Sequence, residues 1–213
     1  MPFSLPRIYL VTDDGLCLSG PLEDVVQRGV KGGAGMVQLR EKGLNTRDFV
    51  ERAIRLRELL SPENIPLIIH DRIDVALAAG ADGVHIGQKD MPYPMARRLM
   101  GSDAIIGLSV ETIEEVIQAN DFDVDYLGIS PVFSTPTKTD TVTEWGTEGI
   151  RTIRSLSRHP LVAIGGIKKE NAGTVIRAGA DCIAVVSEIC ASEDPARAAH
   201  DLLDACSATQ NQP

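Results

Sequence analysis

The segment AGADGV at residues 79–84 decides the fold of this chain, because it returns as AGADCI at residues 178–183. A looser relative, KGGAGMV, occupies residues 31–37. Each copy places glycine where a helix must stop in a left-handed conformation before the next strand begins. Four strand–helix units separate the two close copies, which is the spacing expected of two halves of an eightfold barrel.

Outward from these copies, short apolar runs alternate with amphipathic segments along the chain. Residues 22–30 and 46–60 carry apolar side chains at spacings of three and four, which predicts helices that pack by one face. The predicted strands are residues 7–13, 36–42, 66–72, 83–88, 104–110, 125–133, 161–166 and 182–188. Near-continuous apolar strands that alternate with helices indicate a parallel sheet covered by helices.

We therefore predict a single-domain (β/α)8 TIM barrel with short loops over residues 1–208, followed by a disordered tail at residues 209–213. The alternative is an open, doubly wound sheet. It is disfavoured because no G-x-G-x-x-G sequence follows the first predicted strand.

The composition is that of a soluble globular protein: of 213 residues, 43% are hydrophobic and 24% are charged. A net charge of −9 argues against nucleic acid or an anionic membrane as the main partner, although a pocket for a small anion needs only a local cluster of cations. No apolar run approaches the ~18 residues of a membrane span, and the N-terminus lacks the pattern of a secretion signal. The cysteines form no C-x-x-C pair, so we expect reduced thiols in the cytoplasm at Cys17, Cys182, Cys190 and Cys206.

The second predicted strand ends in the polar sequence Gln38-Leu39-Arg40-Glu41-Lys42. Because side chains alternate along a strand, Gln38, Arg40 and Lys42 share one side. An amide, a guanidinium and an ammonium group on one side are expensive to bury unless an anion meets them. The strand end therefore predicts an anion-binding site.

Two aspartates stand where the next two strands end. Asp71 closes the third predicted strand and Asp90 follows the fourth, and in a barrel these ends meet on one rim. Paired carboxylates beside cations predict Mg²⁺ bound together with a diphosphate. The alternatives are local: Asp71 would pair with Arg72 or cap the helix that starts at Ile73, and Asp90 would cap the following helix.

A second anion site is predicted on the same rim. Gly165-Gly166 and Val186-Ser187 end the last two strands, where backbone N–H groups and a helix N-terminus can hold a monophosphate. The non-periodic segment 134–146 contains threonines and Lys138, which suit a loop that closes on a phosphate; a merely solvated loop is the alternative. Ser109, at the end of the fifth strand, has no recognisable base partner, so no nucleophilic triad is predicted. Two phosphorylated substrates would fit these two sites.

The histidines and the tryptophan give weaker signals. His85 lies inside an apolar strand and is expected to be a hydrogen-bonded core residue rather than a catalytic one, whereas His70 faces the rim. His159 and His200 are predicted at the surface. Trp145 is predicted to pack against the protein rather than to anchor the neighbouring loop.

Several motifs, taken in their order along the chain, resemble those of the thiamine phosphate synthase family. The resemblance extends over nearly the whole length of the chain. The motifs are YLVTD at 9–13, VQLREK at 37–42, DRIDVALAAGADGVHIGQKDMP at 71–92, IGLSV at 106–110, PVFSTPTK at 131–138, AIGGI at 163–167 and AVVSEI at 184–189. The resemblance implies a transferase that joins an aminopyrimidine methyl diphosphate to a thiazole phosphate, or to its carboxylate, with release of pyrophosphate. It also implies a homodimer.

The resemblance also carries residue roles onto this chain by position. It implies that the pyrimidine diphosphate is bound by Gln38, Leu39, Arg40, Glu41, Lys42, His70, Ser109 and Lys138, Mg²⁺ by Asp71 and Asp90, and the thiazole phosphate by Thr135, Thr137, Gly166, Val186 and Ser187. In the family reaction the diphosphate leaves first, and the thiazole attacks the resulting pyrimidine cation. Catalysis then rests on leaving-group stabilisation and positioning, and the implied catalytic residues are Arg40, Lys42, Ser109 and Lys138.

Three positions depart from the family pattern: His70 stands where Asn is usual, Glu111 where His is usual, and Ser130 where Gly is usual. His70 matters most, because that Asn is expected to contact the pyrimidine, although a neutral imidazole can still make one hydrogen bond. Two rival functions follow. One is a thiazole tautomerase on the same barrel, which needs an acid/base and one phosphate site, and the other is a non-catalytic ligand-binding paralogue. The aspartate pair and the TPTK segment favour the synthase.

Overall fold

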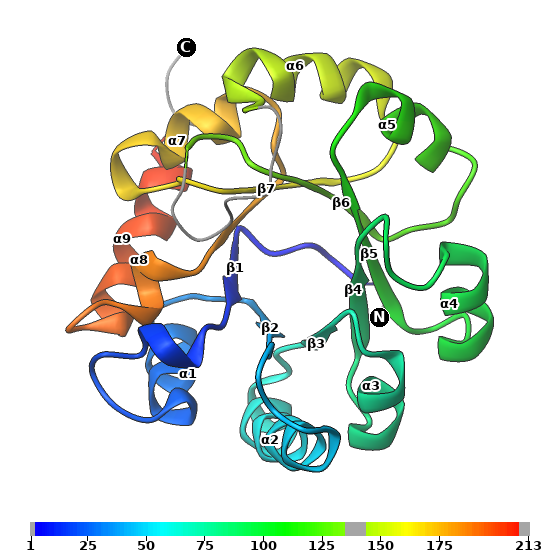
Figure 1. The fold of residues 1–213 in the computed structure, drawn as a ribbon. Coiled ribbons are helices and arrows are strands. Elements are labelled where there is room, and N and C mark those ends of the chain that lie inside the picture. Colours follow the sequence, from blue (N-terminus) through cyan, green and yellow to red (C-terminus); the bar gives the residue numbers. More distant parts are fainter. Residues whose placement is uncertain (1–2, 135–143, 209–213) are drawn as a thin grey trace.

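Eight parallel strands close into a barrel in the computed structural model, which describes residues 3–134 and 144–208 (Figure 1). The strands follow one another in chain order: β1 Ile8–Val11, β2 Met36–Leu39, β3 Leu67–His70, β4 Gly83–Ile86, β5 Ile105–Val110, β6 Tyr126–Ile129, β7 Leu161–Ile164 and β8 Cys182–Val185. Because β1 also pairs with β8, these strands form no exposed sheet edge. The predicted TIM barrel is confirmed, and the open sheet is excluded.

The helices form a ring around the barrel (Figure 1). They are α1 Leu22–Lys31, α2 Thr46–Leu60, α3 Ile73–Ala79, α4 Tyr93–Met100, α5 Ile113–Ala119, α6 Gly146–Leu156, α7 Lys169–Arg177, α8 Ser187–Cys190 and α9 Pro195–Ser207, with short 3-10 helices at η1 Asp14–Leu16 and η2 Ser61–Glu63. The two helices predicted from apolar spacing are α1 and α2. The side chain of Asn45 begins α2 by accepting a hydrogen bond from the Asp48 amide.

The strands are shorter than predicted because their polar ends leave the hydrogen-bond ladder. At β2, the Thr12 amide donates to the Gln38 carbonyl at 2.9 Å, and the Thr12 hydroxyl then accepts from the Arg40 amide at 3.1 Å. A side chain thus replaces the next backbone partner, and the chain leaves the sheet. Arg40 and Lys42 therefore project from a loop that continues the strand.

The apolar core has two layers, separated by the strands. Ile8 and Leu10 of β1 pack against the helices, whereas Tyr9 and Val11, the alternating residues, pack inside the barrel. The buried residues of the inner layer are Tyr9, Val11, Met36, Ile68, Ile105, Tyr126, Val162, Cys182 and Ala184. The barrel is therefore filled by side chains, and two of them carry hydroxyl groups.

The repeated segments end helices as predicted. Gly80 ends α3 at a φ of +63°, and Gly179 follows α7 at a φ of +114°. Only glycine adopts both values easily, because a Cβ strains the backbone at positive φ. The glycines of the repeat therefore turn the chain from helix to strand.

The aspartate of each repeat has a second role that the sequence analysis did not predict. The Asp82 carboxylate accepts a hydrogen bond from the Leu67 amide at 2.8 Å, and the Asp181 carboxylate accepts one from the Leu161 amide at 2.8 Å. Each aspartate precedes one strand and binds the first residue of the strand before it. The repeat thus joins neighbouring strands at their amino ends.

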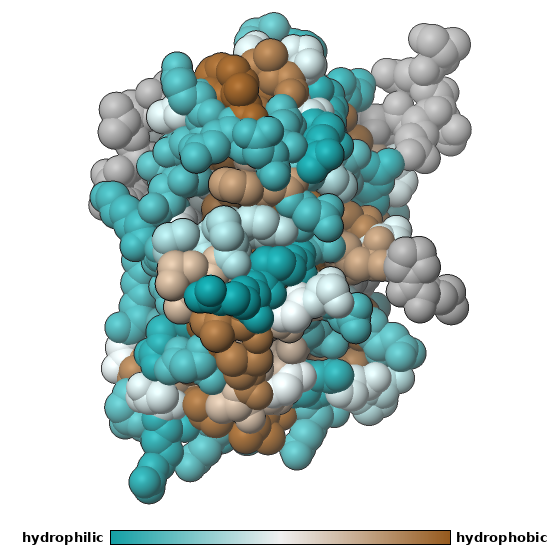
Figure 2. Space-filling view, turned by 90° about the vertical axis from the view of Figure 1, so that its right-hand side faces the viewer, coloured by the Kyte–Doolittle hydropathy of each residue, from teal (hydrophilic) through white to brown (hydrophobic). Residues whose placement is uncertain are grey.

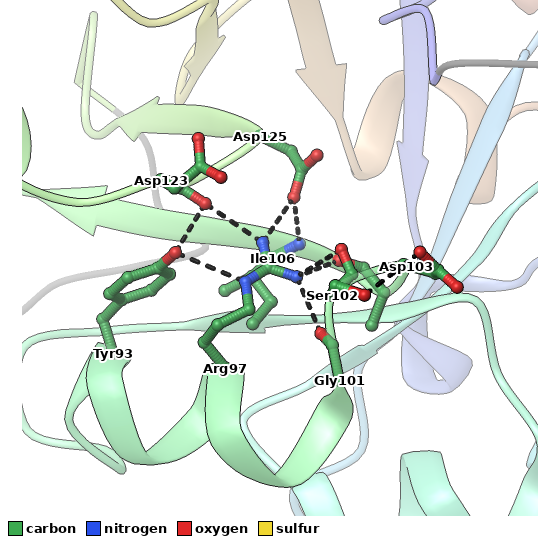
Figure 3. Close-up of polar contacts among 9 residues, drawn as sticks. Tyr93, Arg97, Gly101, Ser102, Asp103, Ile106, Asp123 and Asp125 are labelled. Carbon is green, nitrogen blue, oxygen red and sulfur yellow. Dashed lines mark hydrogen bonds and ion pairs between the residues drawn. The ribbon is translucent and has the colours of Figure 1, made fainter.

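Asp125, which lies outside the two repeats, makes a similar contact to the second residue of β5. Its carboxylate accepts from the Ile106 amide at 2.8 Å and from the Arg97 guanidinium of α4 at 3.1 Å (Figure 3). Arginines of α2 and α6 pair likewise with Asp82 and Asp181, at 3.5 and 3.2 Å. We call the pairs Asp82–Arg57, Asp125–Arg97 and Asp181–Arg154 the aspartate braces. Each brace ties an outer helix to two adjacent strands.

The side of the molecule shown in Figure 2 is largely hydrophilic, with apolar groups exposed among the polar ones. The large apolar side chains exposed on α3, α4 and α5 are Leu77, Met95, Leu99 and Ile117. Within the described ranges, no helix combines the length and the apolar character needed to cross a membrane.

Candidate active site

A cavity of about 320 Å³ is lined by inward-facing residues and by the loops that follow the strands. It brings together the following residues of the predicted site: Gln38, Arg40, Lys42, His70, Ser109, Gly166, Val186 and Ser187. These residues come from five different strand ends, far apart in the sequence. Their convergence on one cavity makes it the candidate active site.

One side of the cavity is cationic. Arg40 and Lys42 both line it, as the alternation of the strand predicted. The Arg40 side chain is only 17% exposed, and its guanidinium lies 3.5 Å from the Asp13 carboxylate. A single carboxylate in loose contact leaves most of the guanidinium's donors available to a phosphate.

Leu39 and Glu41, which the resemblance includes in the substrate site, do not line the cavity. Leu39 is fully buried in the layer between strands and helices. Glu41 accepts a hydrogen bond from the Arg52 guanidinium at 2.5 Å, and Asp14 pairs with the same guanidinium at 3.0 Å. Burial lowers the pKa of Arg52, but the two carboxylates outweigh it and raise the pKa overall. Glu41 therefore stabilises the loop that carries Arg40 and Lys42.

The predicted metal ligands Asp71 and Asp90 are not among the residues that line the cavity, but Arg40 and Lys42 lie close enough to Asp71 to act on its pKa. Burial raises the pKa of Asp71, the Asp90 carboxylate raises it further, and Arg72, Arg40 and Lys42 oppose the rise. Two carboxylates that repel each other can hold a divalent cation, and hard oxygen donors suit Mg²⁺. In residues 3–134 and 144–208 no group of three or more His, Cys, Asp or Glu side chains gathers as a closed metal site. Mg²⁺ needs only one or two carboxylates when water and phosphate complete its shell.

The local alternatives for the two aspartates are not what the structure shows. Arg72 pairs with Asp74 at 2.5 Å and is itself the residue at the N-cap of α3, so Asp71 neither caps α3 nor forms the close pair. Asp71 also has a φ of +55°, a conformation that is uncommon for a residue other than glycine. The Asp90 carboxylate accepts from the Gly87 amide at 2.7 Å and leaves α4 without a side-chain cap.

Another side of the cavity is a turn of glycines after β7, beside the end of β8. Gly165 and Gly166 have φ values of +103° and +63°. A Cβ on Gly166 would lie 2.7 Å from the Ser134 carbonyl oxygen, so only glycine fits. Asn171 holds this turn by donating to the Gly166 carbonyl at 3.0 Å and accepting from the Lys168 amide at 2.8 Å. Lys168 also lines the cavity, although the sequence analysis did not single it out.

The floor of the cavity contains hydroxyl and imidazole groups. Tyr9 and Tyr126 are fully buried, and their hydroxyl oxygens are 3.0 Å apart. His85 lies against Tyr126 and hydrogen-bonds both Tyr126 and Ser109, which confirms it as a hydrogen-bonded core residue. Sequence reasoning missed the two tyrosines. The sequence could have pointed to them, because a tyrosine at an inward-facing position of a buried strand needs a hydrogen-bond partner for its hydroxyl.

The remaining predictions have mixed outcomes. Thr135, Thr137 and Lys138 lie outside the described residues, as does the predicted tail. His200 is exposed, but His159 is only 5% exposed and its Nε2 lies 2.9 Å from the Ala119 carbonyl oxygen, so its predicted surface position is wrong. The His159 ring can be buried because the Ala119 carbonyl oxygen provides a hydrogen-bond partner for its Nε2. Trp145 packs against the outer core layer, as predicted.

A model of the thiamine monophosphate synthase family matches residues 8–189. The chain belongs to this family. A curated thiamine-phosphate synthase from Albidiferax ferrireducens is 57% identical over 203 residues, covering 93% of this chain and 92% of that protein. One from Leptospira biflexa is 52% identical and covers 93% of this chain and 96% of the relative.

A solved structure agrees with the sequence relatives. The thiamine phosphate pyrophosphorylase from Pyrococcus furiosus is 37% identical, and its fold matches with a TM-score of 0.86 over 95% of this chain and 96% of that chain. The thiamine phosphate synthase family catalyses a group transfer, so this member is a transferase of thiamine synthesis. The predicted family and reaction class are confirmed.

Two of the three departures from the family pattern lie in the cavity. His70 and Ser130 both line it, whereas Glu111 is exposed at the end of β5. His70 Nδ1 lies 3.1 Å from the Gln38 side-chain oxygen, and its Nε2 lies 3.6 Å from the Asp71 carboxylate. In this synthase family member, His70 therefore lies between Gln38, which lines the cavity, and Asp71.

Proposed function

We propose that this transferase joins the methylene carbon of an aminopyrimidine methyl diphosphate to the ring nitrogen of a thiazole phosphate, forming thiamine phosphate. The C–O bond to the diphosphate breaks, and pyrophosphate leaves with the electron pair. The thiazole nitrogen then supplies its own pair to the pyrimidine cation, which closes the new C–N bond. No residue has to remove a proton from carbon in this sequence.

The observation that carries the proposal is that two sides of one cavity carry groups suited to bind an anion. Arg40 and Lys42 supply side-chain cations on one side, and Gly166, Ser187 and Lys168 supply backbone donors, a hydroxyl and a cation on the other. The floor between them is aromatic and polar, which suits a heterocycle. A single-phosphate reaction such as a tautomerisation would use only one of these sides.

We assign Mg²⁺ to Asp71 and Asp90. The support is the raised pKa of Asp71 beside the Asp90 carboxylate, together with Arg72, Arg40 and Lys42, which act on Asp71. When bound, the metal would neutralise charge on the diphosphate. Arg40 and Lys42 hold the same group in place and stabilise the negative charge that it carries away.

The decisive experiment mixes the purified protein with both substrates, in Mg²⁺ or in EDTA, and quantifies thiamine phosphate and pyrophosphate. Equal amounts of both products, only with metal, are expected. Folded protein that forms neither product would refute the synthase assignment for these substrates. Incubation with the thiazole carboxylate phosphate alone then detects a tautomerase.

A matched pair of variants tests the metal ligands. Asp71→Asn should lower the rate about 100-fold and raise the Mg²⁺ concentration needed for half-maximal rate. Asp74→Asn is the control, because Asp74 makes the same change three residues away and pairs with Arg72 on the surface. Equal effects of the two variants would contradict the assignment of Mg²⁺ to Asp71.

We also place the enzyme in the cytoplasm, since none of the four cysteines, all of which lie in the described residues, forms a disulfide, and three of them are buried. The homodimer remains a prediction of the family resemblance, which sedimentation of the purified protein would test.

A further inference from the structure

A continuous chain of hydrogen-bonding groups crosses the barrel beneath the cavity. We call it the floor chain, and its members in order are His70, Gln38, Tyr9, Tyr126, His85 and Ser109. The successive distances are 3.1 Å from His70 Nδ1 to Gln38 Oε1, 2.7 Å from Gln38 Nε2 to the Tyr9 hydroxyl, 3.0 Å between the two tyrosine hydroxyls, 3.1 Å from the Tyr126 hydroxyl to His85 Nδ1, and 2.8 Å from His85 Nε2 to Ser109 Oγ. All six residues line the cavity.

The amide of Gln38 gives this chain a direction. Its nitrogen can only donate, so the Tyr9 oxygen accepts from it. Tyr9 has one hydrogen, which then goes to Tyr126, and the single hydrogen of Tyr126 goes to His85 Nδ1. A neutral imidazole that accepts at Nδ1 carries its proton at Nε2, and this proton is donated to the Ser109 oxygen.

Burial enforces this order between the tyrosines. Tyr9 and Tyr126 are at most 1% exposed, and burial raises the pKa of both, so both remain neutral hydroxyls. If Tyr126 donated to Tyr9 instead, the Tyr9 oxygen would receive two donors. The Tyr9 hydrogen would then have no acceptor in the described part of the chain. Buried polar hydrogens are rarely left in that state.

The direction of the floor chain determines what the cavity offers to a substrate. Because the Ser109 oxygen already accepts from His85, the Ser109 hydrogen is available to be donated into the cavity. The second hydrogen of the Gln38 amide is available in the same way, because its first goes to Tyr9 and its oxygen accepts from His70. The floor therefore presents donors to a heterocycle.

We propose that Tyr126 and His85 are positioning residues that fix the Ser109 hydroxyl as a hydrogen-bond donor, so that the cavity selects a heterocycle with an acceptor nitrogen at that point. This inference rests on the proposed function, since it takes the pyrimidine as the ring that meets Ser109. Neither residue acts on the reacting atoms. Each works by setting the orientation of the hydrogen on Ser109.

The first test locates the protons of His85 in the substrate-free protein. Long-range ¹H–¹⁵N spectra of protein labelled at its histidines show which ring nitrogen is protonated, and a His85→Gln variant assigns the signal. The proton is expected on Nε2. A proton on Nδ1 would overturn the proposed direction. This result does not depend on turnover, so it stays informative even if the synthase assay fails.

The second test asks whether Tyr126 acts through Ser109. Tyr126→Phe removes one hydroxyl and should raise KM for the pyrimidine diphosphate about tenfold, the effect of losing one well-placed hydrogen bond. KM for the thiazole phosphate should change less than about twofold, because the effect is local. In a Ser109→Ala background, adding Tyr126→Phe should cost less than about twofold more, since two residues that act through one contact are not additive.

A further tenfold loss in the Ser109→Ala background, or equal increases in both KM values, would overturn the positioning role. Thermal denaturation establishes that each variant folds. Tyr9→Phe breaks the same chain one step earlier and should give the same KM pattern, which keeps the test available if Tyr126→Phe does not fold. An active Tyr9→Phe protein with unchanged KM for the pyrimidine diphosphate would count against the proposal.

Discussion

Replacing Asp125 by alanine should lower the free energy of unfolding by about 3 kcal/mol. The larger part comes from the Ile106 amide, which donates to Asp125 at 2.8 Å and belongs to a residue with no exposed surface. A buried N–H group without a partner costs about 1–3 kcal/mol. The ion pair with Arg97 adds about 0.5–1 kcal/mol, because both side chains remain partly exposed, at 21% and 27%.

Urea unfolding followed by circular dichroism measures this loss directly, with an unchanged m-value expected. For a chain of this size, each kcal/mol lowers Tm by about 2–4 °C, so the variant should melt about 6–12 °C below the parent. Asp125→Asn is the matched control. It keeps an oxygen that can accept from Ile106 and loses only the charge, so its cost should be about 1 kcal/mol.

The reasoning would be refuted if Asp125→Ala lost less than about 1 kcal/mol, or if Asp125→Asn lost as much as Asp125→Ala. Asp82→Ala and Asp181→Ala should behave like Asp125→Ala, because each aspartate accepts from a strand amide at 2.8 Å. The braces lie at the amino ends of the strands, opposite the cavity. Turnover of the folded variants at 25 °C should therefore match that of the parent.

Three further predictions concern single residues. His70→Asn should retain or improve the synthase rate, because it restores the usual family residue; a large loss in kcat would show that His70 has a role of its own. Gly166→Ala should raise KM for the thiazole phosphate about tenfold with little effect on the pyrimidine substrate, since its Cβ would meet the Ser134 carbonyl at 2.7 Å; equal effects on both KM values would argue against the glycine turn as a separate site. Burial lowers the pKa of His159 below its usual value of about 6.5. The unfolded chain therefore binds more protons than the folded one below about pH 6.5, so the free energy of unfolding falls as pH drops through that value. His159→Gln should make the free energy of unfolding less dependent on pH, as measured by urea titrations between about pH 7.5 and 5.5.

The barrel could be predicted because its signals are local. Gly80 and Gly179 mark helix ends through backbone preference alone, and the apolar runs report burial on both faces of each strand. Strand length could not be read in the same way. The end of β2 depends on Thr12, which takes the Arg40 amide from a position 28 residues away.

The residues of the candidate site also fall into two groups, those that a local pattern could predict and those that it could not. Gln38, Arg40 and Lys42 could be placed on one side of a strand because alternation is a local property. Leu39 and Glu41 entered the predicted site through family resemblance, and the same alternation directs them away from the cavity. The hydrogen-bond partner of His159 and the residue pairs of the aspartate braces could not be predicted, because each of these contacts joins residues from different strand–helix units.

The inward-facing residues of the strands explain how a barrel filled with side chains can still present polar and charged groups at one end. On β2 and the loop after it, Met36, Gln38, Arg40 and Lys42 run from apolar to polar to charged, toward the carboxyl end of the strand. Met36 belongs to the buried inner core, and Arg40 faces a cavity where a phosphate can replace water. Gln38 lies between them, too deep to be solvated and too polar to be left without partners. Such a residue must form hydrogen bonds with side chains of neighbouring strands. These bonds make Gln38 a member of the floor chain, whose hydrogen bonds all have a fixed direction. The floor chain is therefore a consequence of the same polarity gradient that places the cations at the rim.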